Sequence, residues 1–220
     1  MVIKRQLISQ SKLISSSTHP HISKNQIIHS AENLILRFTK IKMQSSAIKN
    51  IFAIPGSLRS GSSNHNVLRF LQKIAPENVR LTIYDSLAQI PPFDPGADNE
   101  NPSEPVMELR SFIAHADAVI ICTPEYAFGV PGQLKNALDW TVSSGSLDNK
   151  TLSLITASTG GENAHAALLL IFRALNANVI NDATLLISFI RSKMDQNDNI
   201  IDEATVENLK NALDSLVREL

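Results

Sequence analysis

The chain lacks several features that would place it in other classes of protein. Its single cysteine, Cys122, excludes an internal disulfide and a cysteine-based metal site, and it suits a reducing compartment. We therefore expect a cytoplasmic protein. No apolar run approaches the roughly 20 residues that cross a bilayer, so we expect no membrane partner. His65, His115 and His165 have no histidine or carboxylate partner at metal-ligand spacing, and we expect no metal.

Acidic residues are scarce in residues 1–42, where Glu32 stands against seven lysines and arginines. The rest of the chain holds 13 basic and 20 acidic side chains, so the formal net charge of −1 hides an acidic body. A basic surface, which nucleic-acid binding requires, is therefore missing from the part of the chain with the composition of a folded domain. We expect no nucleic-acid partner.

The N-terminal segment, residues 1–45, has the composition of an extension. It is rich in serine and isoleucine, and three interpretations stand: a disordered extension, a targeting peptide, or an upstream start with Met43 as the true first residue. We favour the third, because Met43 lies just before the first predicted strand. The whole chain of 220 residues is 43% hydrophobic, and we expect residues 46–220 to bury a core as one domain.

The stretch Asn50–Asn64 combines a short apolar run with a loop of glycine and serine, and a helical pattern follows from Val67. A strand-to-helix junction of this kind offers unpaired backbone N–H groups and the positive end of a helix dipole to an anion. Arg59 adds a guanidinium suited to phosphate oxygens. Short polar donors surround it: Ser57, Ser60, Ser62, Ser63 and Asn64. The loop therefore favours a phosphate.

Two common phosphate motifs do not fit this loop. The P-loop of nucleotide triphosphatases needs Lys and then Ser or Thr after its second glycine, whereas Gly61 is followed by Ser62. The dinucleotide fingerprint needs a spacing that Gly56 and Gly61 do not supply. An ordinary serine-rich connection, with Asn64 as the helix cap, remains an alternative on the loop alone.

Strand patterns alternate with helix patterns through the rest of the chain. After the first strand, strands are predicted at 79–85, 118–123, 151–156 and 184–187, and helices after Asn64 and at 104–116, 133–140, 162–175 and 202–220. The continuous apolar run at 118–123 is typical of a strand buried on both faces, so we expect Cys122 to be buried and Trp140 to be a packing residue. The alternation predicts an α/β fold with a parallel sheet and right-handed crossovers.

Ligands of such sheets bind beyond the carboxyl ends of the strands, at a switch point of the topology. Three loops at that edge carry unusual chemistry: 56–64, 123–132 and 156–161. Their convergence favours a ligand site over an ordinary connection, since one Gly/Ser loop is common and three at successive strand ends are less so.

The chain resembles the NADPH-dependent FMN reductase family, whose members include quinone, azo-dye and chromate reductases. The similarity covers about residue 48 to the C-terminus and rests on three motifs, Gly56–Asn64, Thr123–Tyr126 with Gly132–Trp140, and Ser158–Gly161. It implies a flavodoxin-like three-layer sandwich around a five-stranded parallel sheet in the order 2-1-3-4-5. It also implies non-covalent FMN, NADPH or NADH as co-substrate, and a homodimer or homotetramer.

The resemblance assigns roles to residues of this sequence. It implies that the phosphate of FMN is held by the first loop and that the isoalloxazine ring lies between the other two. The implied cofactor-binding residues are Ser57, Arg59, Ser62, Ser63, Asn64, Pro124, Glu125, Tyr126, Ala127, Ser158, Gly160 and Gly161. Two positions depart from the family: Ala127 replaces a usual asparagine, and Ser63 replaces a common aromatic residue.

The chemistry of a flavin enzyme needs no catalytic triad, because hydride transfer is performed by the cofactors, and we name no catalytic acid, base or nucleophile. We expect an NAD(P)H-dependent FMN oxidoreductase with ping-pong transfer to quinones or similar small acceptors. The alternative is a non-enzymatic FMN electron carrier or redox-responsive binding module, with which the acidic body is compatible. The sequence leaves the acceptor and the preference between NADH and NADPH open.

Overall fold

The computed structural model describes residues 47–220, which include all three motifs. The predictions for residues 1–45 lie outside this range. None of the helices in the described range is long and apolar enough to cross a membrane.

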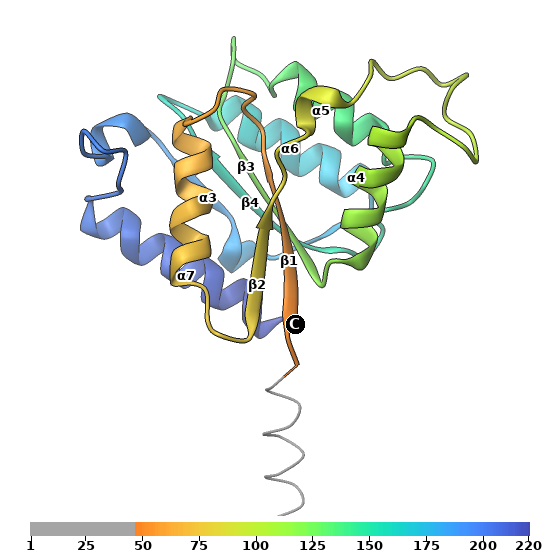
Figure 1. Ribbon diagram of the computed structural model, residues 1–220. Coiled ribbons are helices and arrows are strands. Elements are labelled where there is room, and N and C mark those ends of the chain that lie inside the picture. Colours follow the sequence, from red (N-terminus) through yellow and green to blue (C-terminus); the bar gives the residue numbers. More distant parts are fainter. Residues whose placement is uncertain (1–46) are drawn as a thin grey trace, which may run out of the picture. The chain divides into compact units, whose positions relative to one another are not determined.

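A parallel β-sheet forms the centre of the described domain (Figure 1). Its main strands are β1 (Lys49–Pro55), β2 (Val79–Ile83), β3 (Ala118–Thr123) and β4 (Thr151–Ala157). The spatial order is β2-β1-β3-β4-β5, which confirms the predicted order and the flavodoxin-like α/β class. The order reverses between β1 and β3, and this reversal is the switch point at which a ligand site is expected.

The fifth position of the sheet is shared by two short strands. The strand β5 (Asn178–Val179) pairs with the start of β4, and β6 (Leu185–Ile187) pairs with its end. The prediction found β6 but not β5, because the 3-10 turn η2 (Asn181–Ala183) interrupts the edge and leaves only two residues in β5. A two-residue strand carries too little alternation to be read from sequence.

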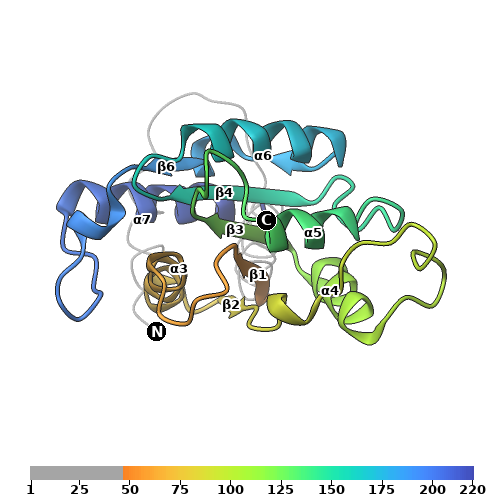
Figure 2. The same cartoon turned by 90° about the horizontal axis from the view of Figure 1, so that it is seen from above.

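Helices cover both faces of the sheet, as the view from above shows (Figure 2). The helices α3 (Ser63–Ile74) and α7 (Glu203–Arg218) lie on one face, and α4 (Glu104–His115), α5 (Gly132–Asp139) and α6 (Glu162–Ala174) lie on the other. Successive residues of β1 alternate between the two cores, with Ile51 toward α3 and α7 and Phe52 toward the other layer. This alternation follows from the pleat of a strand.

The segment that connects β2 to α4 is held by buried polar contacts rather than by regular structure, apart from the 3-10 turn η1 (Leu87–Gln89). Trp140, which is 1% exposed, donates its indole N–H to the Pro91 carbonyl at 2.9 Å. Arg110 contacts the Asp98 carboxylate at 2.6 Å. Trp140 is therefore a packing residue, as predicted, and the long loop is fastened to the body of the domain.

Candidate functional site

The loop between β1 and α3 leaves the sheet against the end of β3. A Cβ added at Gly56 would lie 2.2 Å from Thr123 Oγ1 and 3.0 Å from Leu134 Cδ2, so no larger residue fits there without movement. The Gly56 N–H donates to the Cys122 carbonyl at 2.8 Å. The close approach of the two strand ends brings the loop after β1 beside the loop after β3.

The first turn of α3 presents donors at the end of this loop. Ser62 is the N-cap: its side chain accepts from the His65 N–H at 3.3 Å, which corrects the alternative in which Asn64 caps the helix. The backbone N–H groups of Ser63 and Asn64 have no acceptor among the contacts of the described domain. Ser62, Ser63 and Asn64 are all buried, so these donors are fixed in position at the positive end of the helix dipole.

The loop after β3 contains a tight two-residue turn. Tyr126 and Gly129 exchange backbone hydrogen bonds of 3.0 and 2.9 Å. The two central residues, Ala127 and Phe128, have φ angles of 48° and 58°, which is the left-handed conformation that a type I′ turn requires. The turn leaves Tyr126 54% exposed, with its hydroxyl 3.3 Å from Ser57 Oγ. The first and second loops are thus in direct contact.

The loop after β4 is tied to the same turn. The Glu125 N–H donates to Ser158 Oγ at 3.1 Å, and Glu125 Oε2 accepts from the Ala164 N–H at 2.8 Å. The Glu125 carboxylate therefore caps the first turn of α6, where a negative charge is favourable. Gly161 has a φ of 125°, and a Cβ there would approach Leu186 and Thr156 to 2.9 Å, so glycine is required.

A pocket of about 420 Å³ lies where these loops meet. Its wall combines hydroxyl and amide groups with apolar surface, two arginines and no carboxylate. The lining residues are Ser57, Arg59, Ser62, Ser63, Asn64, Pro124, Tyr126, Ala157, Ser158, Thr159, Ile190 and Arg191. A pocket with this lining favours an anionic ligand that also has an apolar part.

Eight of the twelve residues that the sequence analysis assigned to cofactor binding line this pocket. The other four, Glu125, Ala127, Gly160 and Gly161, lie outside its wall. The contacts of Glu125 and the backbone angles of Ala127 and Gly161 give these residues roles in shaping the loops. Gly160 lies between the two carboxylates Glu125 and Glu162, which are 3.7 and 3.0 Å from the position of an added Cβ.

Sequence reasoning missed a fourth wall, which the segment after β6 provides. The Phe189 N–H donates to the Thr159 carbonyl and the Ile190 N–H to the Ser158 carbonyl, both at 3.1 Å. Phe189 has a φ of 55°, and the 3-10 turn η3 (Ile190–Lys193) begins there and brings Arg191 to the pocket. The rule that ligands bind at strand carboxyl ends, applied to the last strand as well, would have found this segment.

Two half-buried histidines support the loops. His65 Nδ1 lies 3.0 Å from Ser62 Oγ, and burial together with the nearby Arg69 guanidinium lowers the pKa of His65. His165 Nδ1 lies 2.9 Å from Thr156 Oγ1, and burial lowers the pKa of His165. Both imidazoles are therefore neutral at pH 7. The described residues contain no group of three or more His, Cys, Asp or Glu that could hold a metal ion.

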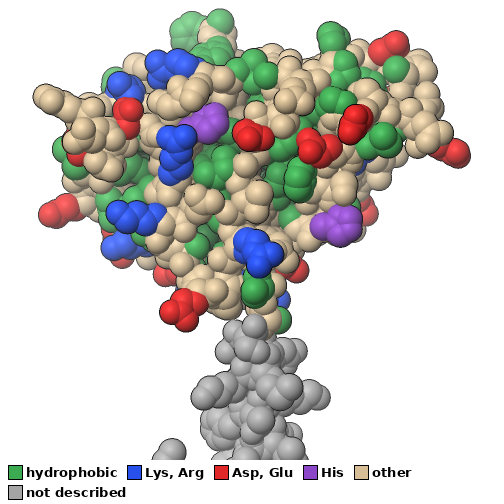
Figure 3. Space-filling model, viewed as in Figure 1, with side chains coloured by type: hydrophobic (Ala, Val, Ile, Leu, Met, Phe, Trp, Pro, Cys, Tyr) green, Lys and Arg blue, Asp and Glu red, His purple; other side chains and the backbone are tan. Residues whose placement is uncertain are grey.

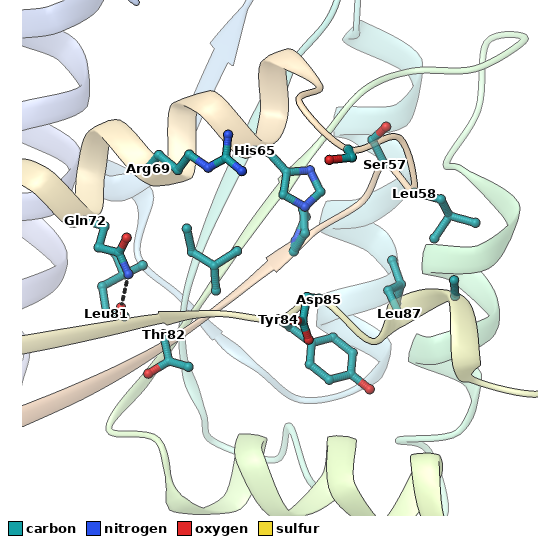
Figure 4. A pocket seen from close by; sticks show the side chains of 14 residues that line it. Ser57, Leu58, His65, Arg69, Gln72, Leu81, Thr82, Tyr84, Asp85 and Leu87 are labelled. Carbon is teal, nitrogen blue, oxygen red and sulfur yellow. Dashed lines mark hydrogen bonds between the residues drawn. The ribbon is translucent and has the colours of Figure 1, made fainter.

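A second pocket of about 620 Å³ lies on the other side of the β1–α3 loop, between α3 and β2. His65 and Arg69 line it from α3, and Asp85 lines it from the residues that follow β2 (Figure 4). Asp85 makes this cavity less suited to an anion than the first pocket. On the same face of the molecule, Lys and Arg gather toward α3 and Asp and Glu toward α4 (Figure 3).

Comparison with known proteins gives a consistent result. Residues 49–191 match the family model described as NADPH-dependent FMN reductase. A quinone reductase of Escherichia coli K12 is 36% identical over 170 residues, which cover 74% of this chain and 90% of that protein. A probable NADPH:quinone oxidoreductase 2 of Oryza sativa subsp. japonica is 28% identical over 174 residues, or 76% of this chain and 86% of that protein.

Among solved structures, the flavoenzyme NAD(P)H:(acceptor) oxidoreductase FerB from Paracoccus denitrificans superposes with a TM-score of 0.63. It is 27% identical in sequence, and the match covers 78% of this chain and 96% of FerB. The similarity therefore extends over nearly the whole of that protein.

Proposed function

The chain belongs to the NADPH-dependent FMN reductase family, and from this premise we propose that it transfers hydride from NADPH or NADH through FMN to quinones or similar small acceptors. Family membership makes the chain an oxidoreductase with a flavin cofactor and a nicotinamide co-substrate. The observation that carries the site assignment is the pocket at the switch point, with a helix N-terminus and two arginines in its wall and no carboxylate.

The phosphate end of FMN fits the β1–α3 loop. The N–H groups of Ser63 and Asn64 and the hydroxyls of Ser57 and Ser62 are buried donors, and Arg59 is an exposed cation beside them. A phosphate dianion placed there meets the helix dipole and charge-assisted hydrogen bonds. The N–H groups of Ser63 and Asn64 have no acceptor in the described domain and would be satisfied by an anion, and the residues present therefore fit the group.

The ring end of FMN fits the opposite part of the pocket, where Pro124, Ala157 and Ile190 supply apolar surface. Tyr126 and Ser158 border this part, and the contacts of Glu125 with Ser158 and the start of α6 hold the two borders together. We propose that Glu125, Ala127, Gly160 and Gly161 act by shaping these borders.

Bound FMN supplies the hydride chemistry, and the tasks left to the chain are binding, orientation and access. The two borders of the ring site belong to different loops that are cross-linked by hydrogen bonds, so the distance between them is fixed. No carboxylate lines the pocket within the described residues, which avoids repulsion of a phosphorylated co-substrate. Arg59 adds positive charge that favours an anionic nicotinamide nucleotide, whereas the charge of Arg191 is partly balanced by its ion pair with Asp198 at 2.9 Å.

We propose ping-pong turnover on one open side of the site. The exposed Tyr126 and Phe128, which are 54% and 82% accessible, mark the side that solvent and substrates reach. If the nicotinamide nucleotide and the acceptor enter by this same side, the pocket accommodates them in turn and not together. The cytoplasmic location, the homodimer or homotetramer and the assignment of residues 46–220 as the FMN-binding domain stay predictions.

The test combines rapid mixing with steady-state kinetics. Mixing the FMN-loaded protein anaerobically with NADPH should bleach the flavin absorbance promptly, and later addition of a benzoquinone should restore it. Initial rates at several fixed quinone concentrations should give parallel double-reciprocal lines. Absence of bleaching over minutes would favour an electron carrier over an enzyme, and intersecting lines would refute the ping-pong order.

A further inference from the structure

Only one of the two polar atoms of the Asn64 side chain, the carboxamide oxygen, has a hydrogen-bond partner in the described domain. Its carboxamide oxygen lies 3.4 Å from Cys122 Sγ, and the two residues are 3% and 0% exposed. The carboxamide nitrogen makes no hydrogen bond within the described domain, and Asn64 lines the pocket assigned to the phosphate. An amide donor with no hydrogen-bond partner in the described domain, on a residue that lines an anion pocket, points to the ligand as its acceptor.

The thiol of Cys122 acts as a donor in this contact. Cys122 lies in β3 within the apolar core, and burial raises the pKa of its thiol well above the ordinary value, so the sulfur stays protonated. A protonated thiol is a weak donor, and within the described domain the acceptor of the Cys122 thiol is Asn64 Oδ1. The same burial shields the sulfur from oxidants and substrates, so Cys122 is not assigned a nucleophilic or redox role.

The orientation of the carboxamide matters because its two ends have opposite polarity. With the oxygen toward Cys122, the amide nitrogen is free to donate toward the pocket. In the flipped orientation the oxygen would face the phosphate and repel it, and the nitrogen would face a sulfur that accepts hydrogen bonds poorly. The position and protonation of the thiol thus select the orientation that an anion needs.

We propose that Cys122 is a positioning residue for the cofactor phosphate. Its thiol donates a hydrogen bond to Asn64 Oδ1, and this orients the carboxamide so that Nδ2 donates to a phosphate oxygen. The inference deepens the proposed function and rests on it, since the phosphate group must belong to the bound flavin. It concerns a residue that no step of the hydride transfer uses.

The experiment compares FMN with riboflavin, which has the same ring and no phosphate. Apo-protein is titrated with each flavin, and the ratio of the two dissociation constants is the readout, because general damage to the fold weakens both flavins alike. Cys122→Ala removes the donor, Cys122→Ser keeps a donor of similar size, and Asn64→Ala removes the positioned group. Ile120→Val, two residues away in β3 and in the same core, is the matched packing control.

Asn64→Ala should lower the preference for FMN over riboflavin by about tenfold, and Cys122→Ala should lower it by about threefold to fivefold. Cys122→Ser should retain the wild-type preference, and so should Ile120→Val. If Cys122→Ala does not fold, Cys122→Val replaces it, since valine also lacks a donor.

An unchanged preference in the donor-free Cys122 variant, together with a loss in Asn64→Ala, would overturn this inference and leave the proposed function intact. A loss in Cys122→Ser equal to that in Cys122→Ala would also overturn it. A wild-type protein that binds neither flavin would overturn the proposed function and this inference with it.

Discussion

The turn at Ala127 offers a quantitative test of what this position does. Ala127 and Phe128 both have positive φ angles, 48° and 58°, between the two hydrogen bonds that join Tyr126 and Gly129. For residues other than glycine and asparagine, the left-handed conformation costs about 1–2 kcal/mol of conformational free energy. Asparagine tolerates this region because its short side chain can form hydrogen bonds locally. The structure therefore gives a backbone reason for the asparagine that the family resemblance led us to expect at this position.

Replacing Ala127 with asparagine should stabilise the apo-protein by about 0.5–1 kcal/mol, half or more of the lower strain value. For a domain of 150–250 residues this corresponds to a rise in Tm of about 1–4 °C. Ala127→Gly should give a smaller rise, because relief of the Cβ strain is offset by the greater freedom of glycine in the unfolded chain. Ala127→Val should lower Tm, since a β-branched residue is least compatible with positive φ.

Differential scanning calorimetry of the apo-proteins measures these changes, and Ala97→Asn is the control. Ala97 is exposed, lies in a loop, and is not among the residues with positive φ. If Ala127→Asn leaves the apo Tm unchanged but tightens FMN binding, the asparagine is a flavin contact and the conformational reasoning is refuted. A rise equal to that of Ala97→Asn would refute it as well.

Three further changes test other parts of the site. Arg59→Ala should weaken FMN binding about tenfold and riboflavin binding little, because Arg59 lies beside the phosphate donors. The control Arg69→Ala, in the second pocket, should leave the affinity for both flavins unchanged. Equal effects of the two substitutions in apo-protein titrations would exclude the role of Arg59. Glu125→Ala should lower the apo unfolding free energy by about 1 kcal/mol in urea titrations, since the α6 N-terminus loses its cap, and an unchanged midpoint would contradict the capping role. Burial lowers the pKa of His165 in the folded protein below its ordinary value of 6.5. As the pH falls, this histidine is therefore protonated in the unfolded chain before it is protonated in the folded protein. The free energy of unfolding should thus fall as the pH drops below 6.5 toward the folded pKa. His165→Gln should flatten this fall in Tm and the exposed control His115→Gln should not, and parallel pH profiles for His165→Gln and wild type would count against the assignment.

Much of the fold was accessible from sequence because its strands are buried on both faces. The run at 118–123 coincides with β3, and the alternation of strands and helices predicted the parallel sheet, whereas the strand order came from the family resemblance. The edge strand β5 was harder to predict from sequence. β5 has two residues, and its pairing depends on β4 rather than on its own pattern.

The candidate site was partly predictable for a similar reason. Residues of the β1–α3 loop lie in one continuous motif, so the signal for Ser57, Arg59 and Asn64 is local. Arg191 reaches the pocket only through the backbone contacts of Phe189 and Ile190 with the loop after β4, a tertiary arrangement that no local pattern encodes. The capping role of Glu125 likewise depends on α6, 39 residues away in sequence.

The central claim is that the loops at the carboxyl edge of the sheet form a site for a flavin phosphate. Isothermal titration of the apo-protein with FMN and, in parallel, with riboflavin tests it most directly. The account predicts one FMN per chain and an affinity at least about tenfold higher for FMN than for riboflavin, which lacks the group held by the α3 N-terminus and Arg59. Equal affinity for the two flavins, or no binding of FMN, would contradict it.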